Sequence, residues 1–207
     1  ELNKIALKIL SNGKGILAAD ESNGTMTKRL ESVNVPSSPE NRLLFRETLF
    51  SSSGMKDFIG GVILYDETIN QISSLKQTIP ELISKSGAVP GIKVDTGAKD
   101  FEGFKGEQFT QGLDNLAERF AEYYEMGARF AKWRMVVTIS DQDTPTYEAV
   151  KMNCMQMARY AMLAQAAGIV PIVEPELIHS GDHSLEKAEL ETTRTLQILF
   201  QTLQEYR

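Results

Sequence analysis

Three pairs of ionisable residues, each spaced two apart along the chain, are the strongest candidates for chemistry in this 207-residue sequence. The pairs are Lys93 with Asp95, Lys132 with Arg134, and Glu174 with Glu176. Side chains two apart on a strand point to the same side, so each pair would face one way. A lysine beside carboxylates in a partly dry pocket can move protons, and a neighbouring arginine can bind a phosphate or carboxylate through two hydrogen bonds. This combination indicates carbonyl chemistry on an anionic substrate.

Lys132 and Arg134 carry the clearest signal because they lie inside the apolar run Phe130–Val137. Burying an unpaired charge costs several kcal/mol, so charges placed there must be paired or used. Glu174 and Glu176 would suit a general acid/base pair in which like charges raise one pKa. The other ionisable residues near predicted strand ends fit equally well as solvated charges in loops.

The turn from Asp20 to Thr25 is a further candidate. It offers the hydroxyls of Ser22 and Thr25 and backbone N–H groups ahead of a predicted helix, a setting that binds phosphate. Clusters of Ser, Asn, Gly and Thr are usually only turns and caps, so this turn alone is weak evidence.

Five near-continuous apolar segments predict strands that are buried on both faces. They are Gly15–Ala19, Gly61–Tyr65, Gly91–Val94, Phe130–Val137 and Ile169–Val173. Their starts are 46, 30, 39 and 39 residues apart, which leaves room for a helix after each strand. The carboxyl ends of parallel strands share one face, so the ionisable residues at these ends should converge there.

Three amphipathic segments predict helices between and after these strands. They are Leu113–Met126, with a stripe of Leu113, Leu116, Phe120 and Tyr123; Tyr147–Ala167, with a stripe of Met152, Met155, Ala158, Met162 and Ala166; and Ser184–Tyr206, with Ser184 as N-cap and a stripe of Leu185, Ala188, Thr192, Leu196 and Leu199. We expect the stripes to be core and Gly97–Gly106 to be an insertion. The pattern predicts an α/β fold with about five of the eight units of a (β/α)8 barrel. A complete five-stranded doubly wound sheet is the alternative.

Composition narrows the class of protein further. A formal net charge of -6 and a pI near 5.1 argue against a nucleic-acid or anionic-membrane surface. The single cysteine, Cys154, suits a reduced cytosolic thiol, and neither a signal peptide nor a transmembrane run is evident, so we expect a cytoplasmic protein. His179 and His183 lie in a polar loop, where solvent exposure is favoured over a metal site. We expect no metal and no cofactor.

Six segments resemble, nearly word for word, those of class I fructose-bisphosphate aldolases, in the same order. The segments are KGILAADES (14–22), GGVILYDET (60–68), GIKVD (91–95), TQGLDNL (110–116), FAKWR (130–134) and GIVPIVEPE (168–176). The resemblance implies a (β/α)8 barrel, usually homotetrameric. It also implies metal-independent cleavage of fructose 1,6-bisphosphate to dihydroxyacetone phosphate and glyceraldehyde 3-phosphate through a lysine imine. A different Schiff-base barrel aldolase should not carry FAKWR and IVEPE together.

The resemblance also implies roles for individual residues. It assigns catalytic roles to Asp20, Lys132, Glu174 and Glu176, and substrate contacts to Ser22, Thr25, Arg29, Arg42, Lys93 and Arg134. In the family the residue matching Lys132 contacts substrate without forming the imine. Thr25 replaces a common serine and keeps the hydroxyl, while Asp66 and Thr96 differ from frequent histidine and lysine.

The imine-forming lysine is implied to lie on a sixth strand, beyond Arg207. We therefore expect residues 1–207 to be one partial barrel domain whose C-terminal units are missing and which is inactive alone. The alternative is a truncated, non-catalytic aldolase-like chain that serves as a binding or scaffold protein.

Overall fold

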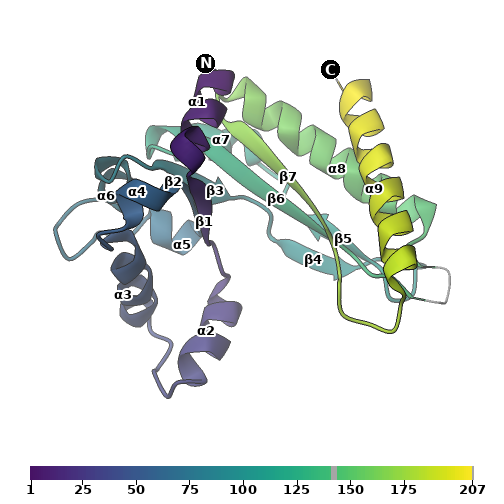
Figure 1. Ribbon diagram of the computed structural model, residues 1–207, viewed down its shortest axis with the longest axis horizontal. Coiled ribbons are helices and arrows are strands. Elements are labelled where there is room, and N and C mark those ends of the chain that lie inside the picture. The colour runs from purple at the N-terminus through teal and green to yellow at the C-terminus, as the bar shows by residue number, and fades with distance from the viewer. Residues whose placement is uncertain (141–143, 207) are drawn as a thin grey trace.

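A five-stranded parallel sheet forms the centre of the computed structural model, which describes residues 1–140 and 144–206 (Figure 1). Its strands are β1 (Gly15–Ala19), β2 (Ile59–Leu64), β3 (Val89–Lys93), β6 (Phe130–Val137) and β7 (Val170–Leu177). All five predicted strands are confirmed; β1 and β6 have the predicted bounds, and the bounds of β2, β3 and β7 are shifted. The predicted fifth strand ended at Val173, whereas β7 runs to Leu177, so Glu174 and Glu176 lie inside a strand and not beyond it.

The order of the strands decides between the two predicted architectures. Within the sheet the order is β1-β2-β3-β6-β7, so every new strand of the sheet is added on the same side. A doubly wound sheet needs a point at which this order reverses. The sheet is therefore part of a (β/α)8 barrel, and the doubly wound alternative is wrong.

Helices fill the connections between the strands (Figure 1). They are α1 (Leu2–Ile9) before β1; α2 (Asn23–Glu31), α3 (Pro39–Phe50) and α4 (Met55–Phe58) before β2; α5 (Asp66–Ile69) and α6 (Ile79–Lys85) before β3; α7 (Leu116–Glu125) before β6; α8 (Tyr147–Ala166) before β7; and α9 (Leu185–Glu205) after it. A short 3-10 turn, Ser11–Gly13, links α1 to β1. Ser184 caps α9 as predicted, since its side chain accepts a hydrogen bond from the Lys187 N–H.

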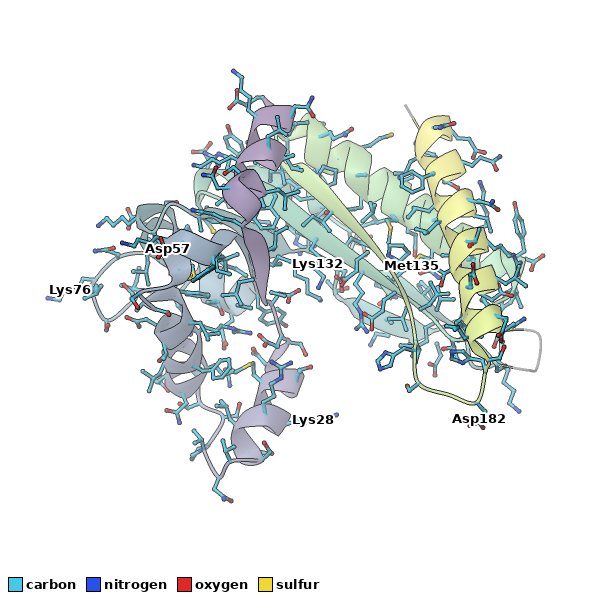
Figure 2. The ribbon with its side chains drawn as sticks, viewed as in Figure 1. Lys28, Asp57, Lys76, Lys132, Met135 and Asp182 are labelled. Carbon is cyan, nitrogen blue, oxygen red and sulfur yellow. The ribbon has the colours of Figure 1, made fainter. Side chains whose placement is uncertain are left out.

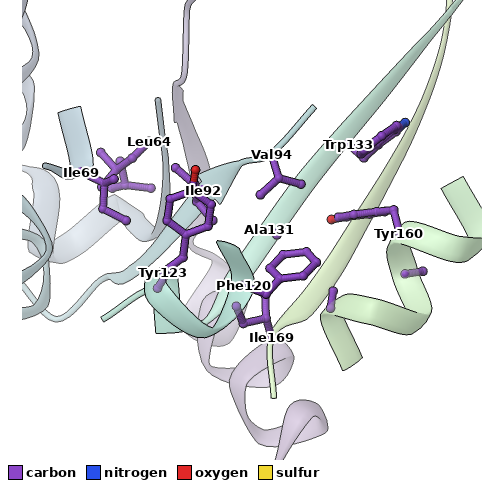
Figure 3. Packing of buried hydrophobic residues seen from close by; sticks show 14 of the residues in the cluster. Leu64, Ile69, Ile92, Val94, Phe120, Tyr123, Ala131, Trp133, Tyr160 and Ile169 are labelled. Carbon is purple, nitrogen blue, oxygen red and sulfur yellow. The ribbon is translucent and has the colours of Figure 1, made fainter. Parts of the chain in front are cut away.

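The two faces of β6 differ in character. Trp133 and Met135 are fully buried toward the helices, and the Trp133 ring stacks on Tyr160 of α8 with centroids 5.5 Å apart (Figure 3). Lys132 and Arg134 alternate with them and are only partly buried. Because side chains alternate along a strand, the apolar core on one face places both cations on the other.

The predicted core stripe of α8 is wrong at its methionines. Met152, Met155 and Met162 are 37%, 40% and 43% exposed. The buried face instead carries Val150, Cys154, Met157, Ala161 and Ala164. Apolar residues occupy most positions around this helix, so two different stripes match a helical period and the periodicity alone cannot choose between them.

The stripes of the other two helices fare differently. In α7 the predicted residues Leu116, Phe120 and Tyr123 are buried, as expected. In α9 Leu185 and Leu196 are exposed, and Leu199 is the predicted stripe residue that is fully buried. The rest of the buried face of α9 is polar, with Glu191, Thr195 and Thr202.

The segment predicted as an insertion, Gly97–Gly106, begins an antiparallel hairpin of β4 (Gly97–Asp100) with β5 (Gln108–Gln111), which lies just beyond it. The Asn153 side chain of α8 accepts a hydrogen bond from Thr110 N (3.1 Å) and donates one to Gln108 O (2.9 Å). Gly112 follows the hairpin with a φ of +130°, and a Cβ there would lie 2.9 Å from Thr96 N. A glycine is therefore required where the chain passes this close to the end of β3.

Two prolines lie in β7, at the edge of the sheet. The N–H groups of Val170 and Ile178 donate to Arg129 O (3.0 Å) and Val137 O (2.8 Å), so even-numbered residues bond toward β6. Pro171 and Pro175 occupy odd positions, whose backbone nitrogens point to the open side. Prolines in a sheet are confined to such edge positions because they have no N–H to donate.

Candidate active site

The carboxyl ends of the strands surround a cleft of about 830 Å³. Polar side chains from all five predicted strand ends line it, and Lys132, labelled in Figure 2, lies among them. The charged lining residues are Asp20, Glu21, Asp66, Lys93, Asp95, Asp114, Arg119, Lys132, Arg134, Glu174 and Glu176. The predicted convergence of these strand ends at one face is therefore confirmed.

Lys132 joins three strands in one ion-pair cluster. Its Nζ lies 3.2 Å from Asp20 Oδ2, just past the end of β1, and 3.0 Å from Glu174 Oε2 in β7. Two strands separate β1 from β6, and in a flat sheet that would place β1 and β6 about 14 Å apart. Contact between Asp20 and Lys132 therefore requires a sheet that curves around the cleft.

The protonation state of Lys132 follows from this cluster. Burial lowers the pKa of Lys132, but the charges of Asp20 and Glu174 and their hydrogen bonds raise it further, so the pKa lies above its usual value. Lys132 is therefore an ammonium at neutral pH. It can donate a proton or stabilise a developing negative charge, but it is not a free amine nucleophile.

Arg134 and Glu176 form a second pair across β6 and β7, through Arg134 Nε and a Glu176 carboxylate oxygen. The hydrogen bond from Arg134 is the main reason that the pKa of Glu176 lies below its usual value, and nearby cations lower it further. The expectation that like charges raise the pKa of one glutamate is not met at Glu176. This residue stays a carboxylate and orients the arginine.

Three more predicted residues lie in the cleft. Lys93 Nζ is 2.7 Å from Asp95 Oδ1. The Ser22 side chain caps α2 by accepting a hydrogen bond from Thr25 N (3.4 Å), and the two hydroxyl oxygens are 3.2 Å apart. The predicted turn is therefore a helix N-terminus that opens onto the cleft, where backbone N–H groups favour anions.

The structure does not bring Arg29 and Arg42 into the cleft lining. Arg29 pairs with Glu21. Arg42 is 9% exposed and donates to both carboxylate oxygens of Glu67, at 2.5 and 2.8 Å. Their predicted contacts with substrate gain no support from this geometry.

Sequence reasoning missed the contribution of α7 to the cleft wall. Arg119 donates hydrogen bonds to Val94 O (3.0 Å) and Gly112 O (3.2 Å). Tyr123, one helical turn later, donates to Asp66 Oδ1 (2.6 Å), and burial together with this bond raises the pKa of Tyr123 to about 12. A polar residue four positions before a buried tyrosine was the available signal.

The cleft carries more acid than base. Of its described lining residues, seven are carboxylates and four are cations. Within residues 1–140 and 144–206, no three His, Cys, Asp or Glu side chains are grouped as metal ligands would be. The arrangement is thus suited to proton transfer around a central ammonium.

Comparison with known proteins decides the family. The family model for fructose-bisphosphate aldolase class-I, a glycolytic family, matches residues 1–207. The chain belongs to the class I fructose-bisphosphate aldolases. The resemblance of the six segments is confirmed, and the alternative of a different Schiff-base barrel aldolase is set aside.

Curated relatives cover the chain from end to end. A fructose-bisphosphate aldolase of Schistosoma mansoni is 46% identical over 207 residues, which are 100% of this chain and 57% of the relative. Fructose-bisphosphate aldolase B of Gallus gallus is 47% identical over 206 residues, 99% of this chain and 56% of the relative. The chain thus spans little more than half the length of these aldolases.

A solved structure shows the same fold. It is the fructose-bisphosphate aldolase from Plasmodium falciparum in complex with TRAP and a small-molecule inhibitor, with a TM-score of 0.96 and 42% identity. The match covers 99% of this chain and 59% of that chain. In the part of this aldolase chain that the structure describes, no helix is long and apolar enough to cross a membrane.

Proposed function

We propose that the protein catalyses the reversible cleavage of fructose 1,6-bisphosphate into dihydroxyacetone phosphate and glyceraldehyde 3-phosphate through a lysine imine. The observation that carries this proposal is the Lys132 ammonium, held between Asp20 and Glu174 in the cleft at 3.2 and 3.0 Å. An ammonium between two carboxylates can pass protons to and from a substrate that is bound as an imine. The imine-forming lysine is proposed to lie after residue 207, which the family resemblance supports.

We assign the roles within this reaction as follows. Asp20 assists the carbinolamine and carbon–carbon bond steps. Lys132 stabilises developing charge and supports proton movement, and its raised pKa suits it to that role and not to imine formation. Glu174 is the general acid/base of imine formation and hydrolysis, and Glu176 keeps Arg134 oriented toward the cleft.

Substrate contacts follow from the same geometry. Lys93 and Arg134 line the same cleft as Ser22 and Thr25, and these four residues are proposed to bind anionic and hydroxyl groups of the sugar phosphate. Because carboxylates outnumber cations among the described lining residues, we propose that this half of the site mainly moves protons. Arg29 and Arg42 are left out of this assignment because neither of them lines the cleft and each is paired with a glutamate, Glu21 and Glu67 respectively.

We further propose a homotetramer in the cytoplasm. The family resemblance supports both the homotetramer and the cytoplasm. The single cysteine, which is buried, further supports a reducing compartment. Light scattering on the protein made from its complete gene would give the mass of the assembly, and a monomeric mass would contradict the tetramer.

The test uses that same protein, incubated with fructose 1,6-bisphosphate and borohydride, with and without EDTA. Borohydride reduces an imine to a stable amine, so the substrate stays attached to one lysine and peptide mass mapping locates it. We expect one adduct beyond residue 207, none on Lys132 or Lys93, and no effect of EDTA. The Lys132→Arg variant is the matched control, because it keeps the positive charge but cannot release its proton as readily.

Other results would contradict separate parts of the proposal. An adduct on Lys132 would overturn its assignment as the residue that moves charge. Loss of turnover in EDTA would overturn the metal-independent reaction. If no adduct and no turnover are observed, the proposal of an enzyme is wrong, and the non-catalytic binding or scaffold protein is favoured.

A further inference from the structure

Strand β6 continues past the point where β3 can pair with it. The last backbone bond between the two runs from Val94 N to Lys132 O (3.1 Å), whereas β6 goes on to Val137. The backbone of Arg134 therefore has no strand partner on that side. Two side chains take over: Asp95 Oδ2 accepts from Arg134 N (3.3 Å), and Thr110 Oγ1 donates to Arg134 O (2.8 Å).

The same Asp95 carboxylate holds two further groups. Its Oδ1 forms an ion pair with Lys93 Nζ (2.7 Å) and accepts a hydrogen bond from Gly97 N (3.2 Å). Lys93 Nζ also donates a hydrogen bond to the backbone carbonyl of Asp95 (3.1 Å). The Asp95 side chain is 3% exposed and that of Lys93 is 16% exposed. A carboxylate this deeply buried requires such donors, because an unpaired charge would be costly there.

Only one of these three donors can move freely. Arg134 N and Gly97 N belong to the backbone. Arg119 fixes the backbone next to Asp95 by donating a hydrogen bond to Val94 O (3.0 Å). Lys93, in contrast, reaches Asp95 through a flexible side chain that lines the cleft. Asp95 therefore sets the position of the Lys93 ammonium relative to the backbone that carries Lys132 and Arg134.

We propose that Asp95 is a positioning residue, which holds the Lys93 ammonium ready to meet an anionic group of the substrate. This inference rests on the function proposed above. Holding a long lysine in place before the substrate arrives lowers the entropy lost on binding. Asp95 itself need not touch the substrate, so its effect must pass through Lys93.

A double-mutant cycle separates this role from a purely structural one. Asp95→Asn keeps the shape and an acceptor oxygen but removes the charge. We expect it to raise KM for fructose 1,6-bisphosphate about tenfold with a smaller change in kcat, and to have no such effect on KM in a Lys93→Met background. Asp100→Asn, the same substitution in β4 and outside the cleft lining, is the matched control.

A second measurement does not depend on catalysis. Trinitrobenzenesulfonate labels free amines, so peptide mapping can follow its reaction with Lys93 in the wild type and in Asp95→Asn. We expect labelling of Lys93 to be about threefold faster in the variant, because a lysine released from the ion pair with Asp95 is more mobile and easier for the reagent to reach. This shift would support the Lys93–Asp95 coupling even if the protein has no aldolase activity, so failure of the proposed function remains distinguishable.

Two results would contradict a positioning role for Asp95. If the KM effect of Asp95→Asn is the same with and without Lys93, or if labelling of Lys93 is unchanged, Asp95 has only a structural role. If Asp95→Asn does not fold, Asp95→Glu replaces it in the same cycle. An increase in KM that persists in the Lys93→Met background would again overturn the proposal.

Discussion

Two buried charge clusters lie within this barrel segment, and they differ in what surrounds them. The cleft cluster consists of Lys132, Asp20 and Glu174. The α3 cluster consists of Arg42, Arg46, Glu21 and Glu67. The cleft cluster opens into the space at the carboxyl ends of the strands, whereas Arg42 and Arg46 do not line that space. Both clusters contain buried cations, and access of the cation to the cleft separates them: Lys132 lines the cleft, whereas of the α3 cluster only the carboxylate Glu21 does.

The donors are also used differently. Arg46 is fully buried and donates hydrogen bonds to Thr68 Oγ1 (2.6 Å) and Glu21 O (2.5 Å). Arg42 donates hydrogen bonds to Glu67 and to Ser37 O (2.9 Å). These acceptors are fixed parts of the fold. Lys132 has a compact, rotatable ammonium, and both of its partners are carboxylates that line the cleft. The comparison indicates that the α3 cluster stabilises the fold and the cleft cluster performs chemistry.

The largest effect should come from removing the cation of the cleft cluster. Lys132→Met in the complete protein is expected to lower kcat/KM about a thousandfold, because a positioned proton donor contributes about that much. Steady-state kinetics measure this, with thermal unfolding of the same sample as the control. A melting temperature that falls together with activity would contradict this division of roles, since Lys132 would then act like the arginines of the α3 cluster.

The next effect should appear in stability. Arg46→Met removes a fully buried guanidinium and leaves Glu21 and Thr68 without it, so the free energy of unfolding should fall by about 3 kcal/mol. Urea unfolding measures this loss. Activity per folded molecule should fall far less than for Lys132→Met, and an equal fall in both variants would contradict the division of roles.

The smallest effect should be the pH dependence of the α3 cluster. The hydrogen bonds from Arg42 are the main reason that the pKa of Glu67 is lowered in the folded state. A lowered folded pKa adds stability above the unfolded value of about 4.3, and this stability is lost as the pH falls through the folded pKa. Glu67→Gln should therefore cost about 1.5 kcal/mol at neutral pH and much less near pH 3. A cost that does not depend on pH would show that the charge of Glu67 contributes nothing.

Much of the fold and the centre of the site were predictable from the sequence. The apolar runs located all five strands, and the rule that parallel strands end on one face brought Asp20, Lys132 and Glu174 together before any coordinates. Lys132 and Arg134 were identifiable because a charge inside an apolar strand must be paired or used.

Other features depend on partners that are distant in the sequence. Nothing near Arg42 indicates that Glu67 binds it, so a resemblance-based role in substrate binding could not be tested against a competing ion pair. The exposed methionines of α8 were misassigned because that helix is apolar on more than one side. The β4–β5 hairpin was missed because its strands are four residues each, and side chains such as Asn153 hold it in place.

The prolines of β7 have a consequence for mechanics. A neighbouring strand on the open side of β7 would receive no N–H from positions 171 and 175, so the seam there would contain fewer backbone hydrogen bonds than the seam with β6. Such a seam is the easiest place for a parallel sheet to part. Pro171 and Pro175 thus mark the edge at which the strands of the barrel would separate first under mechanical force. The same two residues also make β7 a poor template for pairing with a strand of another molecule.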